Sequence, residues 1–164
     1  TFGGRQTYLA GAERGLAAGE PWYCEFGPEL SRGFRALKVW MTIQEHGLDM
    51  LGQIVSKHCR IAKTTAERIS ADESLELLTP PSLNIVCFRF KGHDLAEGRL
   101  DEINQRIVET LHVEGLAAPS TTKIDGKLAI RACFCNHRTE QADADALVDN
   151  VRRFGQEILY SVSR

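Results

Sequence analysis

At 164 residues the chain has the length of one domain, and its 43% hydrophobic and 26% charged residues are typical of a globular protein. A net charge of −2 provides no excess of cations for nucleic acid or an anionic membrane, so we expect neither partner. No apolar run approaches the ~18 residues that span a bilayer, and the first residues do not resemble a signal peptide. The five cysteines, an odd number in mostly apolar segments, favour free thiols, and we expect a cytoplasmic protein.

Residues 1–30 contain six glycines and few periodic apolar positions, which predicts a long mobile segment followed by a linker. The chain starts with Thr1 and its opening has no core pattern, so we interpret it as a piece of a longer protein. Helical spacing of apolar residues then predicts two connecting helices within 31–70, one ending at Gly47 and the next covering 48–69. His58 falls on the apolar side of the second helix, where we expect a hydrogen-bonded core imidazole.

Residues 71–164 read as a small α+β domain. Strands are predicted at 75–78 and 83–90, separated by a break at Pro80 and Pro81, and a helix is predicted over 99–112. Asp125-Gly126 predicts a tight hairpin turn between strands at 117–124 and 127–135, and a last helix capped by Thr139 follows. This order favours a mostly antiparallel sheet with helices on one side.

Arg131 is the first candidate for chemistry, because strand alternation places it with Ala129, Cys133 and Cys135 rather than with the large apolar residues of its strand. A guanidinium keeps its proton, so a partly buried one needs a carboxylate or phosphate partner. From the residues alone, an internal Asp or Glu is the favoured partner and a bound anion is the alternative. No set of histidines and cysteines has the spacing of a metal site, and we expect no metal.

Two other features draw attention. Tyr8 lies in the glycine-rich segment, where loop closure would let a phenol donate a proton, although a lone loop tyrosine is more often a plain surface residue. Arg32, Arg35 and Lys38 follow one another at helical spacing at the start of a helix, which is unfavourable unless an anion lies nearby. A structural pairing is the favoured interpretation for Lys38.

The segments "SRGFRALKVWMTIQEHG", "NIVCFRF" and "RACFCNHRT" resemble the C-terminal part of the pyridoxal-phosphate-dependent group II amino-acid decarboxylases, the family of aromatic-amino-acid, glutamate and cysteine-sulfinate decarboxylases. The resemblance covers nearly the whole chain and implies the small C-terminal domain of a fold-type I enzyme. It further implies a homodimer, an upstream large domain that binds pyridoxal 5′-phosphate (PLP), and an amino-acid substrate whose decarboxylation uses the cofactor ring as an electron sink.

The resemblance also implies roles for three residues. "TYL" matches a mobile catalytic loop whose tyrosine returns a proton to the substrate, which makes Tyr8 the general acid, whereas a phenylalanine there would indicate aldehyde-forming chemistry. Arg131 matches the arginine that meets the substrate's α-carboxylate. Ser31 matches a position that reaches the neighbouring subunit's substrate pocket. Gly33 departs from the family, in which a second arginine is frequent there.

None of the lysines has the family's His-Lys-Trp context, so the Schiff-base lysine is expected upstream and the chain is not expected to be active alone; the lysines are Lys38, Lys57, Lys63, Lys91, Lys123 and Lys127. Two alternatives to a carboxy-lyase stay open. One is a non-catalytic α+β module for dimerisation or effector binding. The other is the small domain of another aminotransferase-like PLP enzyme.

Overall fold

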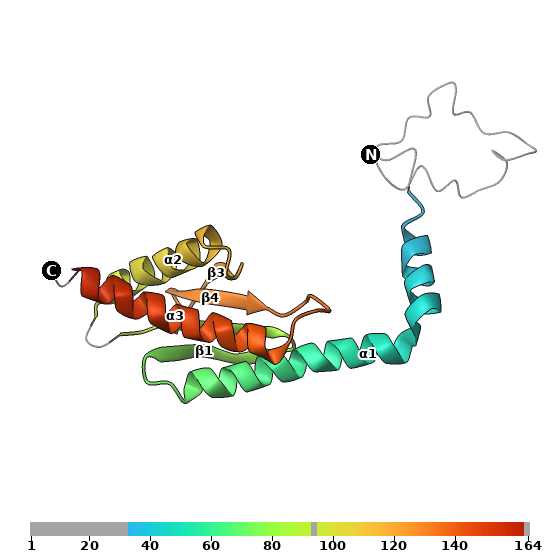
Figure 1. Cartoon of the computed structure of the whole chain (residues 1–164), viewed down its shortest axis with the longest axis horizontal. Helices are drawn as coiled ribbons and strands as arrows, with labels where there is room; N and C mark the ends of the chain where they lie inside the picture. Colours follow the sequence, from blue (N-terminus) through green and yellow to red (C-terminus); the bar gives the residue numbers. More distant parts are fainter. Residues whose placement is uncertain (1–32, 93–94, 163–164) are drawn as a thin grey trace, which may run out of the picture. The chain divides into compact units, whose positions relative to one another are not determined.

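The computed structural model describes residues 33–92 and 95–162 (Figure 1). Contacts divide the chain at Gly47 into two units, Thr1–Gly47 and Leu48–Arg164. Helix α1 (Arg35–Ser70) is interrupted at the same residue, where φ 74° and ψ 159° are not helical. A positive φ costs glycine little because it has no Cβ, which explains why the predicted end of the first helix at Gly47 is confirmed.

The second unit contains a four-stranded antiparallel sheet in the order β1-β2-β4-β3. Its strands are β1 (Leu75–Ser82), β2 (Ile85–Phe90), β3 (Ser120–Ile124) and β4 (Lys127–Cys133). Helix α2 (Glu97–Val113) follows β2, and helix α3 (Gln141–Val162) follows β4. The predicted α+β class with an antiparallel sheet is therefore confirmed.

One face of the sheet forms the core with the helices. Val86, Phe88 and Phe90 of β2 and Ile130 and Ala132 of β4 are buried on this face. Against them pack Ile107 and Leu111 of α2, Val151 and Phe154 of α3, and Ala62 and Ile69 of α1. Figure 1 shows α3 running along the sheet and the C-terminal part of α1 beside β1. Burying one continuous apolar face is what fixes which face of each strand points inward.

The backbone hydrogen bonding between β2 and β4 is replaced, at one end of the two strands, by hydrogen bonds to side chains of α2. Pairing of these strands ends at Phe88 and Ile130. Beyond it, the buried Asn104 amide of α2 accepts a hydrogen bond from Phe90 N–H (2.8 Å) and donates to Phe90 C=O (2.7 Å), and Asp101 accepts one from Leu128 N–H (2.9 Å). Side chains of α2 thus replace the missing ladder bonds, which leaves no buried backbone group of Phe90 unpaired.

Three local expectations need correction. β1 continues through Pro80 and Pro81 to Ser82, because it is an edge strand with irregular register in which a missing N–H is tolerated. Leu83 is not a strand residue but part of the β1–β2 turn, with φ 53°. α3 begins at Gln141, and Thr139 is not its cap; instead Asp143 accepts a hydrogen bond from Glu140 N–H, as in half of a capping box.

Two further local expectations are confirmed, although β3 begins at Ser120 rather than at residue 117 and β4 ends at Cys133 rather than at Cys135. Asp125 and Gly126 both have positive φ (49° and 81°), as a tight two-residue hairpin turn between β3 and β4 requires. His58 is buried, and its Nε2 lies 2.9 Å from Asn136 C=O in the loop between β4 and α3. In the described residues, no helix is long and apolar enough to cross a membrane.

Gly155 provides a test of how α3 packs on β2. A Cβ at position 155 would lie closer to the Phe90 ring than van der Waals contact allows. We expect Gly155→Ala to lower the free energy of unfolding by about 1–3 kcal/mol, despite the better helix propensity of alanine. The control is Gly52→Ala in α1, where a Cβ would meet nothing within 4 Å and stability should rise by up to ~1 kcal/mol. Urea denaturation of both variants measures this, and equal effects would contradict the packing.

Candidate functional site

Arg131 lies on the sheet face opposite the core. In register, it pairs with Cys87 of β2 and Ser120 of β3, and the alternation of β4 puts Ala129 and Cys133 on the same face. All four of these neighbours have small side chains. Arg131 itself is half-buried.

Among the described residues, no acidic side chain lies within salt-bridge distance of Arg131. The internal carboxylate that the sequence favoured as its partner is therefore not observed in that part of the chain. A guanidinium without a counter-ion on a half-buried surface is suited to bind an anion from outside it. Its role in binding a substrate stays a prediction.

Cys87 lies beside Arg131 and is only 7% exposed. Burial raises the pKa of the Cys87 thiol, and the positive charge of Arg131 lowers it by a smaller amount. The net effect is an upward shift of the pKa, so the thiol stays protonated at neutral pH. Cys87 is consequently a neutral neighbour and does not compensate the charge of Arg131.

A second arginine on this face, Arg89, was not identified from the sequence. It is 2% exposed, and its Nε donates to Glu76 Oε2 (2.7 Å), while its two terminal nitrogens donate to Glu97 Oε2 (2.6 Å) and Oε1 (3.2 Å). Lys127 Nζ also reaches Glu76, at 3.1 Å. We call Glu76, Arg89, Glu97 and Lys127 the ion-pair cluster. The alternation of "VCFRF" indicates that Arg89 lies on the sheet face opposite to that of the phenylalanines. It does not reveal the ion pairs, because the acidic partners are distant in the sequence.

The ion-pair cluster is electrically balanced. Burial raises the pKa of the Glu76 carboxyl, but hydrogen bonds from Arg89 and Lys127 outweigh it and hold the pKa below the ordinary value of 4.5. The hydrogen bond from Arg89 also lowers the pKa of Glu97. Two cations thus face two ionised carboxylates at neutral pH. On the described part of this sheet face, Arg131 is left as the cation without a paired acid.

Known proteins are similar to this chain over most of its length. The model of the family described as "Pyridoxal-dependent decarboxylase conserved domain" matches residues 5–91, more than half of the chain. The chain belongs to the pyridoxal-dependent decarboxylase family. The match includes Tyr8 and Ser31, both of which lie outside the described residues, and it ends before Arg131.

Individual decarboxylases are similar to the chain beyond residue 91, where the family match ends. An aromatic-L-amino-acid decarboxylase of Bacillus atrophaeus is 31% identical over 98% of the chain and 34% of its own length. Tyrosine decarboxylase 1 of Narcissus pseudonarcissus is 33% identical over 79% of the chain and 28% of its own length. The chain therefore spans about a third of the curated relatives it matches.

Solved structures of the decarboxylases and related enzymes share the fold. The glutamate decarboxylase domain of a diaminobutyrate enzyme from Vibrio parahaemolyticus gives a TM-score of 0.67 at 30% identity, covering 74% of the chain and 26% of that protein. 4-Hydroxyphenylacetaldehyde synthase of Rhodiola rosea gives 0.74 at 27% identity, covering 83% and 29%. The described sheet and helices therefore correspond to one portion of such enzymes.

In the described residues, one groove contains a lysine, but it does not fit a PLP site. Such a site needs a free lysine, an acid for the ring nitrogen and several donors for the phosphate. Lys57 is paired with Glu140 and Lys127 with Glu76. A groove of 630 Å³ between α1 and β1 contains Lys63 and Glu67. Ser70 adds one side-chain hydroxyl for a phosphate, and the other described lining residues are apolar.

The ion-pair cluster predicts an acid-sensitive step in stability. Because the pKa of Glu76 is lower in the folded chain than its ordinary 4.5, its contribution is complete above about pH 4.5 and is lost as the pH falls through the folded value. We expect Glu76→Gln to reduce the loss of unfolding free energy between pH 7 and about pH 4. Urea denaturation across this range, with the exposed Glu109→Gln as control, measures the difference. An unchanged pH dependence in Glu76→Gln would contradict the assignment.

Proposed function

We propose that this chain is the C-terminal part of a PLP-dependent decarboxylase that converts an L-amino acid to an amine and carbon dioxide. Within it, Arg131 binds the α-carboxylate of the substrate. The observation that carries this proposal is the half-buried Arg131 guanidinium, which has no acidic partner among the described residues while its neighbour Arg89 has two. Membership of the pyridoxal-dependent decarboxylase family and the names of the relatives support the reaction.

The geometry of the arginine suits this task. A guanidinium offers parallel N–H donors that match the two oxygens of a carboxylate, so it fixes the plane of that group as well as its position. Fixing the carboxylate orients the bond from Cα that must break. Arg131 is on a strand paired on both sides, which makes it a rigid support. PLP, in this proposal, is bound by the portion of the enzyme that the relatives have beyond this chain.

Replacement of Arg131 tests the proposal. In the full-length protein, Arg131→Lys keeps the charge but loses the fork, so we expect kcat/KM for the amino acid to fall about 10- to 100-fold. PLP affinity, followed by absorbance, should change much less. Arg106→Lys on the exposed surface of α2 is the matched control and should leave both values unchanged. Equal losses of substrate and PLP binding in Arg131→Lys would indicate a structural role instead.

For Tyr8 we propose the role of proton donor to the substrate carbon after carbon dioxide leaves. The support is its match to the family's catalytic-loop motif. In the full-length protein, Tyr8→Phe should slow amine formation by about 10²- to 10⁴-fold with PLP absorbance unchanged. Because some relatives are named as aldehyde synthases, the product is analysed for aldehyde as well as amine. A normal yield of amine from Tyr8→Phe would rule out this role.

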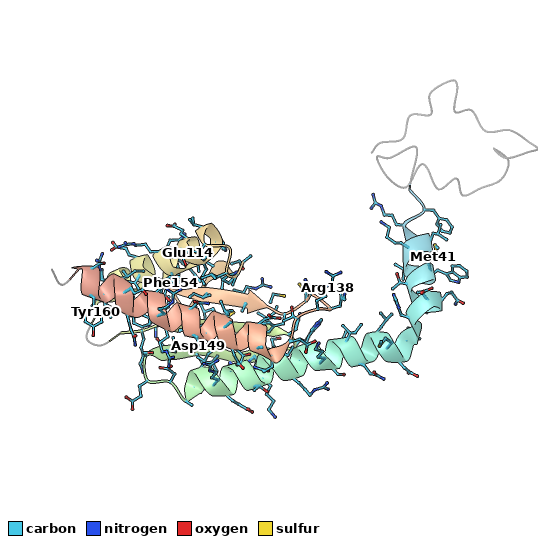
Figure 2. All side chains as sticks on the ribbon, in the orientation of Figure 1. Met41, Glu114, Arg138, Asp149, Phe154 and Tyr160 are labelled. Atoms are coloured by element: carbon cyan, nitrogen blue, oxygen red, sulfur yellow. The ribbon has the colours of Figure 1, made fainter. Side chains whose placement is uncertain are left out.

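We also propose that the enzyme is a cytoplasmic homodimer, in which Ser31 reaches the substrate pocket of the neighbouring subunit. Support for a partner surface comes from the helical residues 35–46, where Trp40 and Met41 are 59% and 56% exposed. Figure 2 labels Met41 on this helix. Exposed large apolar side chains on one short helix favour burial against another protein surface. The free thiols of Cys59, Cys87, Cys133 and Cys135 support a reducing compartment.

A further inference from the structure

The sheet face opposite the core carries two arginines at neighbouring positions. Arg131 of β4 pairs in register with Cys87 of β2, and Arg89 follows Cys87 by two residues on the same strand and the same face. Two residues of a strand span about 7 Å. The two arginine side chains therefore start from one small area of the sheet, on the scale of a small molecule with two charged groups.

Arg89 already binds a carboxylate through two parallel contacts. Its two terminal nitrogens donate to the two oxygens of Glu97, at 2.6 and 3.2 Å. A guanidinium that contacts both oxygens of one carboxylate is the arrangement by which proteins recognise carboxylate ligands. Glu97, a residue of the chain itself, thus occupies the place that the carboxylate of a ligand would take at Arg89.

Glu97 forms the solvent side of this ion pair. It lies in the first turn of α2, and its side chain is 61% exposed, whereas that of Arg89 is 3% exposed. The Nε of Arg89 is held separately by Glu76 of β1, at 2.7 Å. Removal of the Glu97 carboxylate therefore exposes the terminal nitrogens of Arg89, while Glu76 continues to hold the guanidinium from the other side.

We propose that Glu97 is a specificity-determining residue: by occupying Arg89, it leaves one open guanidinium on this face and selects against amino acids with an acidic side chain. The inference rests on the proposed function for placing the substrate's α-carboxylate at Arg131. With Glu97 in place, the ion-pair cluster is balanced and offers no cation to a second carboxylate. An acidic side chain would lose hydration there without gaining a partner, a cost that an uncharged side chain does not have.

Replacement of Glu97 tests this role in the full-length protein without PLP. The probes are pentanoate and glutarate, which have the same number of carbons and differ by one carboxylate, and isothermal titration calorimetry gives their dissociation constants. In the unchanged protein, glutarate should bind about as tightly as pentanoate. In Glu97→Ala, the dissociation constant of glutarate should fall about three- to tenfold, because its second carboxylate reaches Arg89. That of pentanoate should stay the same.

Glu102→Ala is the matched control. Glu102 is also a carboxylate of α2, is 63% exposed and is paired with Arg99 rather than Arg89, so its loss removes the same charge from the same helix. It should leave both dissociation constants unchanged. Glu97→Gln keeps one acceptor oxygen for Arg89 and should give a smaller gain for glutarate. Equal tightening of both probes, equal gains in Glu97→Ala and Glu102→Ala, or no gain in either Glu97 variant would each overturn the inference.

Release of carbon dioxide separates this inference from the proposed function. When PLP is supplied, the ratio of kcat/KM for glutamate to that for phenylalanine should rise in Glu97→Ala and stay unchanged in Glu102→Ala. A gain for glutarate in a protein that releases no carbon dioxide from any amino acid would retain Glu97 as the group that excludes a second carboxylate and refute the decarboxylase. Carbon dioxide release without a gain for glutarate would overturn the role of Glu97 alone.

Discussion

The buried guanidinium of Arg89 determines the charge of the sheet face on which Arg131 lies. A charge that is 2% exposed is costly unless acids compensate it, and Glu76 and Glu97 do so from β1 and from the first turn of α2. With Lys127 also bound to Glu76, the ion-pair cluster has no net charge at neutral pH. The two arginines of this face thus differ because carboxylates reach one of them and, within the described residues, not the other.

The same region is held by α2 through backbone hydrogen bonds. Where β2 and β4 stop pairing, the Asn104 side chain forms hydrogen bonds with the N–H and the C=O of Phe90. Asp101 accepts a hydrogen bond from Leu128 N–H. The start of α2 is therefore bound to two central strands and, through Glu97, to Arg89. Such support around a strand residue like Arg131 is what a ligand-binding group needs to keep a fixed orientation.

Local sequence predicted the features whose cause is local. Gly47 and Asp125-Gly126 were identified because their backbone conformations depend on the residues themselves, and His58 because helical periodicity places it on an apolar side. The prediction ended β1 at residue 78, before Pro80, because proline within a strand is tolerated mainly at a sheet edge or a bulge. Strand order is not visible in the local pattern. Leu83 was wrongly predicted as a strand residue for a similar reason. Its positive φ belongs to a turn, and the position of that turn is fixed by the register of β1 and β2, which the local pattern does not show.

The sequence by itself indicated the fold class and, for the strand that contains Arg131, which residues face the core and which lie on the opposite side, because alternation and apolar periodicity are properties of short segments. Only the tertiary structure decided which arginine is paired. Glu76 and Glu97 are 13 and 8 residues from Arg89 along the chain and meet it through strand pairing and the docking of α2.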